Sequence, residues 1–351
     1  MQMKRLYGIA ACALLMMIFN SIMSFVSQPY KTRLSEYGLF MGDIRKQVPA
    51  PGVLLYALNA PLFSDYTQKL RFVQLPVTST VSYNPDSVFQ FPVGTRIAKT
   101  FFYYNDERSP SKGRRLVETR ILLHEEKGWK ALPYVWNEDQ SDAFLELAGI
   151  NSRVQYINHS GDKIAFDYQV PNMNQCKSCH ERNGVLTPIG PSARQLNGGL
   201  DYEGKTMNQL MKWNEAGVLS GLPEDKTSIP KMVDYSDPSK SLNERALAYL
   251  DANCAHCHNL AGQAQTSGLF LDWFTKDKTA FGFYKTPIAA GRGSGGLNFD
   301  IVPGKPSESI LLFRMASTDP GIMMPELGRK FKHTEGLQLI EEWIKSMKAE
   351  K

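Results

Sequence analysis

Two five-residue stretches of this chain, residues 176–180 and 254–258, share the pattern Cys-x-x-Cys-His. Two thiols three positions apart can reach the two vinyl groups on one edge of a porphyrin, and the histidine that follows can ligate the iron. A zinc site or a pair of disulfides is the competing interpretation, but zinc leaves both histidines unexplained. The sequence therefore predicts two covalently bound haem c groups. The predicted binding residues are the thiols of Cys176, Cys179, Cys254 and Cys257, with His180 and His258 as iron ligands.

The cysteine count agrees with this prediction. Of the five cysteines, Cys12 lies in the N-terminal leader and the other four belong to the two motifs. No cysteine is left for a structural disulfide, although an exported protein could form one.

Residues 1–27 have the pattern of a signal peptide or an N-terminal membrane anchor. Lys4 and Arg5 precede an uncharged apolar run from Leu6 to Val26, which is about as long as a membrane span needs. No clean small-x-small cleavage site follows, so cleavage and anchoring both stay open. In either case we expect the rest of the chain to be periplasmic or otherwise exported, with membrane association through this segment if it is retained.

The length of 351 residues allows two or three domains. Residues 28–170 predict a β-rich domain, because apolar residues alternate along 117–123 and 164–170 and turn signals separate the runs. An antiparallel sandwich or barrel is expected there. Neither the formal charge of +5 nor any motif supports a nucleic-acid partner.

Residues 171–240 form the first haem c segment, with a helix expected at 206–216. So short a segment hardly buries a haem alone. We therefore expect the first haem to pack against the β-rich domain, the second haem domain or both. Its sixth iron ligand is left open among Met207, Met211, Met232 and none.

Residues 241–351 begin with a capping box, Ser241 to Glu244, whose helix runs directly into the second motif. A helix from Ser307 to Met315 and a closing amphipathic helix over 334–347 are expected, with a Met-Pro loop between them.

This order of helix, haem motif, Met-Pro loop and last helix resembles the class I cytochrome c domain. In that family a loop methionine supplies the sixth iron ligand, and the matching residue here is Met324. Pro325 disfavours helical backbone at Met324, which agrees with a loop position. Met323 is a close competitor and Met315 a distant one.

The wider chain resembles a group of bacterial di-haem c-type cytochromes without a settled reaction. The resemblance implies two haems and an exported location, and supplies no substrate. The matching stretches are residues 61–66, 91–95, 134–138, 175–180, 188–191 and 324–328.

The expected fold class is thus α+β multidomain: an antiparallel β-sandwich or barrel-like domain, then a mainly α-helical haem c region with a class I cytochrome c-like C-terminal domain. We expect single-electron transfer between exported redox partners, a donor and an acceptor, with an electron carrier favoured over an enzyme. The alternatives are a peroxidase- or oxidase-like enzyme with one open iron, for which His159 or Arg194 could serve, and a cytochrome subunit of a periplasmic dehydrogenase. Arg292 is a candidate partner of a haem propionate.

Overall fold

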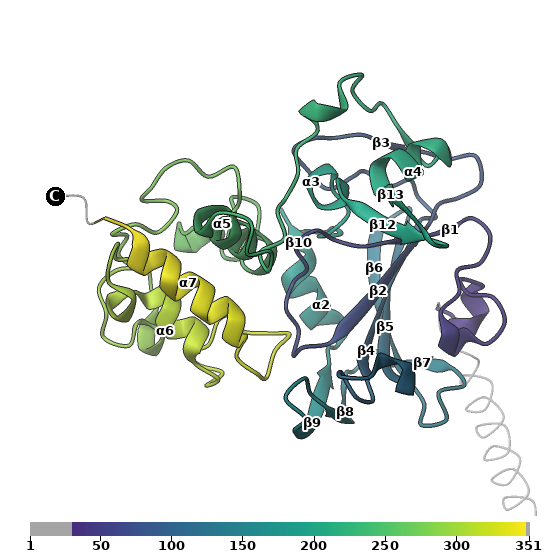
Figure 1. The fold of residues 1–351 in the computed structure, drawn as a ribbon, viewed down its shortest axis with the longest axis horizontal. Coiled ribbons are helices and arrows are strands. Elements are labelled where there is room, and N and C mark those ends of the chain that lie inside the picture. Colours follow the sequence, from purple (N-terminus) through teal and green to yellow (C-terminus); the bar gives the residue numbers. More distant parts are fainter. Residues whose placement is uncertain (1–29, 349–351) are drawn as a thin grey trace, which may run out of the picture.

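The largest element of the fold is an open antiparallel sheet (Figure 1). The computed structural model describes residues 30–348, and the leader with Cys12 lies outside them. The sheet has six strands in the order β1-β2-β4-β5-β6-β7, each antiparallel to its neighbours. Its strands are β1 (Val53–Tyr56), β2 (Gln68–Gln74), β4 (Arg96–Tyr104), β5 (Arg114–Glu125), β6 (Gly128–Trp136) and β7 (Ala143–Leu145). Because β1 and β7 stand at opposite ends of this order, the sheet is not a closed barrel.

The other strands form two-stranded units. They are β3 (Val81–Ser82) parallel to β14 (Leu219–Ser220), and the antiparallel pairs β8 (Ile150–Ile157) with β9 (Lys163–Val170), β10 (Glu181–Arg182) with β11 (Val185–Leu186), and β12 (Gly199–Tyr202) with β13 (Lys205–Asn208). The strands predicted from alternation over 117–123 and 164–170 are confirmed as parts of β5 and β9.

The helices are short, and two of them, α2 and α4, follow a strand within three residues. The α-helices are α2 (Met173–His180), α3 (Ala193–Leu196), α4 (Gln209–Glu215), α5 (Leu242–Asn253), α6 (Ile310–Ala316) and α7 (Thr334–Ser346). Short 3-10 helices are η1 (Leu34–Tyr37), η2 (Ile44–Lys46), η3 (Pro110–Lys112), η4 (Lys226–Ser228), η5 (Gln265–Ser267), η6 (Gly291–Ser294) and η7 (Pro306–Glu308).

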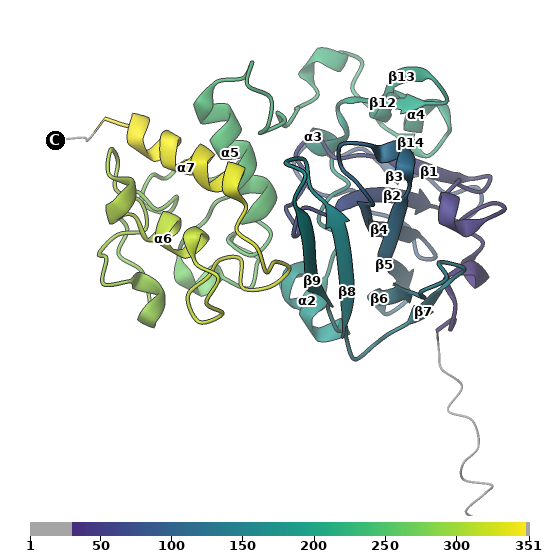
Figure 2. The same cartoon turned by 60° about the horizontal axis from the view of Figure 1, so that its bottom comes forward.

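Each face of the large sheet is covered by a different part of the chain. On one face, Leu34 and the segment around it pack against the central strands. On the other face, Cys176 and Trp213 join Ile97 in one buried cluster, so α2 and α4 cover this side. The segment with α5, α6 and α7 lies beside the sheet, next to α2 (Figures 1 and 2).

The expected fold class is wrong. The described chain is β-rich with several sheets, and the part after Pro171 is mostly loops, short strand pairs and short helices, not a mainly helical haem region with a cytochrome c domain. The helix expected at 206–216 shows the reason. Its first residues pair as strand β13 with β12, and the helix begins only after its cap, Asn208. Strands of two to four residues are too short for a period to be detected.

Two helix N-caps were predicted, Ser241 and Ser307, with different outcomes. The box at Ser241 is confirmed, since its Oγ accepts a hydrogen bond from the Glu244 amide at 3.2 Å and the Glu244 carboxylate accepts one from the Ser241 amide at 3.1 Å. Ser307 does not cap α6, because it lies in η7, and α6 begins after Ser309.

A contact between α5 and α7 fixes the C-terminal part. Gly336 of α7 lies against the ring of Tyr249 of α5, and both are buried. Leu250 and Ile340 extend this contact into a shared apolar core. Within residues 30–348, the longest helices are too short or too polar to cross a membrane.

We predict that Gly336→Ala lowers the free energy of unfolding, although alanine is normally the better helix former. A Cβ at this position would overlap the Tyr249 ring, and overpacking costs about 1–3 kcal/mol, more than the roughly 1 kcal/mol that alanine gains in helix propensity. Urea unfolding measures the difference. Gln338→Ala, on an exposed position of the same helix, should change stability by no more than about 0.5 kcal/mol. A Gly336→Ala protein as stable as the wild type would contradict the packing described here.

Candidate functional site

The first Cys-x-x-Cys-His motif occupies the last turns of α2. The N-cap of this helix is Asn172, whose side chain accepts a hydrogen bond from the Gln175 amide at 2.9 Å, while the Gln175 side chain accepts one from the Asn172 amide at 3.0 Å. Cys176 is buried in the cluster under the helix, whereas Cys179 and His180 are half-buried. The capping box therefore fixes where α2 begins and, with it, the position of the motif on the helix.

The second motif follows α5 without a break. Cys254 is the C-cap of the helix, and residues 254–258 form a turn that the His258 amide closes by donating to the Cys254 carbonyl at 2.9 Å. Asn259 stabilises the turn, since its side-chain amide donates to the Ala255 carbonyl at 2.6 Å. The turn directs the motif toward the first one.

The motif histidines are held in the same way in both copies. Nδ1 of His180 lies 3.0 Å from the carbonyl oxygen of Thr187, and Nδ1 of His258 lies 3.2 Å from that of Leu269. A carbonyl only accepts, so these contacts keep the proton on Nδ1 and leave Nε2 with a free lone pair. Burial lowers the pKa of both histidines to about 4. Each imidazole is therefore neutral and oriented, as a metal-ligating histidine must be.

Each motif opens into a cavity. The first cavity has a volume of about 120 Å³ and is lined by Cys176, Cys179 and His180. The second has a volume of about 350 Å³ and is lined by Cys257 and His258. The second volume lies within the roughly 300–1,000 Å³ range of sites that enclose small molecules. The residues common to both cavities are Cys179, Asn253, Cys254, His256, Met315, Met324, Pro325 and Leu327, so the two spaces adjoin.

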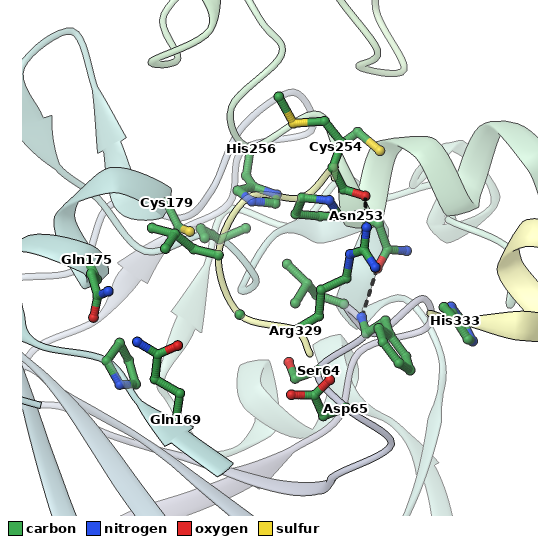
Figure 3. Close-up of a pocket in the computed structure, with 18 of the residues that line it drawn as sticks. Ser64, Asp65, Gln169, Gln175, Cys179, Asn253, Cys254, His256, Arg329 and His333 are labelled. Atoms are coloured by element: carbon green, nitrogen blue, oxygen red, sulfur yellow. Dashed lines mark hydrogen bonds between the residues drawn. The ribbon is translucent and has the colours of Figure 1, made fainter. Parts of the chain in front are cut away.

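Direct contacts join the two motif segments. The Asn183 amide donates to the Ala261 carbonyl at 2.8 Å, and Sγ of Cys257 lies 3.8 Å from the carbonyl oxygen of Ser178. Figure 3 shows His256 extending toward Cys179 across the space between the segments. Groups bound at the two motifs would therefore be neighbours.

The four motif cysteines are free thiols with different acidities. Burial raises the pKa of Cys176 to about 11 and that of Cys254 to about 12. A hydrogen bond with Cys257 lowers the pKa of Cys179 against the opposing effect of burial, and raises that of Cys257. Within residues 30–348, no three His, Cys, Asp or Glu side chains are grouped as ligands of a metal ion.

The methionines of the Met-Pro loop lie differently from each other. Met324 is half-buried and lines both cavities, whereas Met323 is buried and lines neither. Met315, on α6, also lines both cavities. Of the three methionines predicted as alternatives, Met324 and Met315 thus lie at the cavities and Met323 does not.

None of the three methionines considered for the first haem lies at the first cavity. Met232 is buried in a small cluster with Ala248, Met211 packs beside Trp213, and Met207 lies in β13. The first cavity is lined instead by Met315 and Met324 and by the imidazoles of His256 and His333.

Three further predicted residues lie away from both cavities. Arg292 is exposed and pairs with Asp319 at 3.4 Å. Arg194 pairs with Asp251 at 3.3 Å beneath the ring of Trp273. His159 is exposed beside β8.

Sequence reasoning missed several cavity residues. Arg329 is buried, and its Nη2 donates to the carbonyl oxygens of Met324 at 2.8 Å and Ser317 at 2.9 Å, so it fixes the loop that carries Met324 (Figure 3). Lys99 and Arg120 line the first cavity from the sheet. Nothing in the sequence marks these cations, because their position depends on strand register.

No family model, no curated protein and no solved structure matches this chain.

The imidazole of His333 makes the first cavity sensitive to acid. His333 stacks on Phe63 with 4.2 Å between ring centres, and Tyr249 lies 3.2 Å from its Nδ1. Burial lowers its pKa to about 4, below the roughly 6.5 of an unfolded histidine. The unfolded chain therefore binds this proton first, and stability that is complete above pH 6.5 or so falls as the pH drops toward 4.

We predict that the wild type loses about 2–3 kcal/mol more stability than His333→Gln between pH 7 and pH 4. Urea unfolding at both pH values measures this. His159→Gln removes an exposed histidine and should follow the wild type. Equal losses in the wild type and His333→Gln would show that His333 is not held neutral.

Proposed function

We propose that this chain is a di-haem c-type cytochrome that transfers single electrons between exported redox partners. Cys176 and Cys179 would hold one haem and Cys254 and Cys257 the other, with His180 and His258 as iron ligands. The observation that carries the proposal is the paired Nδ1–carbonyl contact of the two motif histidines. This is the arrangement that orients a ligating imidazole, and it occurs at the same position of both motifs.

The residues around each motif fit such a group. The thiols are free, the imidazoles are neutral, and each motif opens into a cavity. At the second motif the cavity volume supports the fit. The first cavity is smaller, so there the fit rests on the two thiols and the imidazole of the motif.

Haem supplies the one-electron chemistry, and this chain supplies its surroundings. The adjoining cavities would keep two haems close to each other, and apolar lining residues such as Leu269 and Leu271 would exclude water from the second. Met324 is our candidate sixth ligand at the second motif, because it lines that cavity and its loop is held by the hydrogen bond from Arg329 to its carbonyl oxygen. Thioether ligation raises the reduction potential, which suits an electron carrier.

A second candidate function is an enzyme with one open iron, such as a peroxidase or oxidase. The observation in its favour is that neither methionine of the first cavity belongs to it alone, since Met315 and Met324 also line the second. The first iron would be open if one of them ligates the second iron and neither the other methionine nor a cavity imidazole, His256 or His333, ligates the first. A role as the cytochrome subunit of a dehydrogenase differs from the leading proposal only in the partner.

We predict two haems per chain in protein matured in an exporting host with haem c attachment. Pyridine haemochrome absorbance against protein concentration, with the mass of the intact chain, counts them. Replacing Cys176 and Cys179 by alanine should leave one haem, and replacing all four motif cysteines should leave none. Colourless wild-type protein, or protein containing zinc, would contradict the proposal.

We predict that Met324→Ala abolishes the methionine-to-iron charge-transfer band of one haem and lowers its reduction potential, because the thioether is lost. Near-infrared absorption and a redox titration measure both. Met323→Ala, a buried neighbour outside the cavities, should keep the band. Loss of the band in Met315→Ala instead would move the assignment to α6. A high-spin iron that binds cyanide in the wild type would favour the enzyme.

A further inference from the structure

Three cations stand in one row across the centre of the large sheet. Arg71 of β2 pairs directly with Lys99 of β4, and Lys99 pairs directly with Arg120 of β5. Directly opposed residues on adjacent strands point to the same face, and like charges in such positions destabilise a sheet. The row is therefore unfavourable for folding unless something compensates it.

The row lies on the face that carries the first motif. Ile97, two residues before Lys99, belongs to an apolar row with Val73 and Leu122, and this row packs with Cys176 in one buried cluster. The cations are the next row along the same face. Lys99 and Arg120 consequently line the first cavity.

Carboxylates compensate only part of this charge. Arg120 is bound by Glu118, with Nη2 to Oε1 at 2.5 Å and Nε to Oε2 at 2.8 Å. Lys99 has no hydrogen bond or ion pair with any residue in 30–348; its ammonium lies 4.6 Å from the ring centre of Phe101. Among the same residues, Nη2 of Arg71 is buried without a hydrogen-bond partner.

The remaining walls of the first cavity add positive charge. Arg329 and Lys330 line it. Among residues 30–348 the one carboxylate that lines it is that of Asp65, which already accepts hydrogen bonds from the amides of Lys330 at 2.6 Å and Phe331 at 2.8 Å. Burial lowers the pKa of Lys99 well below its ordinary value, and the neighbouring cations lower it further, while the carboxylate of Glu118 acts in the opposite direction. A half-buried ammonium without an ion-pair partner is costly, and functional sites are where proteins retain such conflicts.

We infer that Lys99, flanked by Arg120 and backed by Arg71, is an anion-binding position that receives a carboxylate or oxyanion in the first cavity. Two sources share this chemistry. One is a propionate of the haem at Cys176 and Cys179, and this source rests on the proposed function. The other is a free small carboxylate or oxyanion that enters the cavity as a ligand.

The test uses Lys99→Met, which removes the charge and keeps the chain length. Its matched control is Lys130→Met, the same change on β6 of the same sheet, outside the first cavity. Haem content is measured first. Each haem is then titrated for its reduction equilibrium, with and without sodium acetate or inorganic phosphate, and thermal unfolding is followed in haem-free protein.

A propionate at Lys99 predicts that Lys99→Met shifts the reduction equilibrium of one haem about tenfold toward the oxidised form, because a nearby positive charge is lost, while acetate and phosphate have no effect. A free ligand predicts instead that acetate or phosphate shifts that haem in the wild type and in Lys130→Met, but not in Lys99→Met. In both cases haem-free Lys99→Met should unfold at a higher temperature than the wild type, since an uncompensated charge has been removed. A role for Lys99 that is only structural predicts a lower unfolding temperature.

The inference is overturned if the reduction equilibria of both haems in Lys99→Met, and their response to acetate and phosphate, are the same as in the wild type. If the wild type binds no haem, the proposed function fails, and calorimetric titration of that protein with acetate and phosphate decides the anion site separately. If Lys99→Met does not fold, Lys99→Gln replaces it. The dependence of wild-type unfolding on acetate or phosphate then still measures anion binding directly. No stabilisation by either anion in haem-free protein would then overturn the inference.

Discussion

The burial of Cys176 against the apolar row of the large sheet is the contact on which the site depends. Val73, Ile97 and Leu122 form one apolar row of the sheet, and they belong with Cys176 of α2 to the same buried cluster. The helix is held at its N-terminal cap and at this buried thiol. His180 is thereby directed toward Thr187, and the rest of the motif toward the second one.

Backbone carbonyls and caps, more than helix packing, organise the surroundings of both motifs. Thr187 and Leu269 accept from the histidines, and Arg329 binds the carbonyl of Met324. Such contacts need loops that turn at set positions, which explains why so little of the chain after Pro171 is helical. They also explain why the expected cytochrome c-like domain was wrong, although a helix, a motif, a Met-Pro loop and a last helix follow in the expected order.

Two neighbouring rows of the large sheet differ in what they contribute: one is apolar and stabilises the fold, and the next carries three positive charges. The apolar row supplies buried area, and the row with Lys99 places uncompensated charge beside the first cavity. A protein selected for stability alone would carry apolar residues in both rows. The unfavourable row is therefore the clearest sign that this face has a function beyond packing.

The sequence by itself determined the elements whose signal is local. The alternation in β5, the capping box at Ser241, the amphipathic α7 and the two motifs with their cysteines and histidines all depend on spacing within a few residues, and spacing is visible along the chain. Tertiary structure alone decided which distant residues meet. The alignment of Lys99 with Arg120 depends on strand register, the contact between the two motifs on how α2 and α5 are placed, and the position of Met315 beside both cavities on the packing of α6. These are long-range contacts, for which the sequence carries no periodic signal.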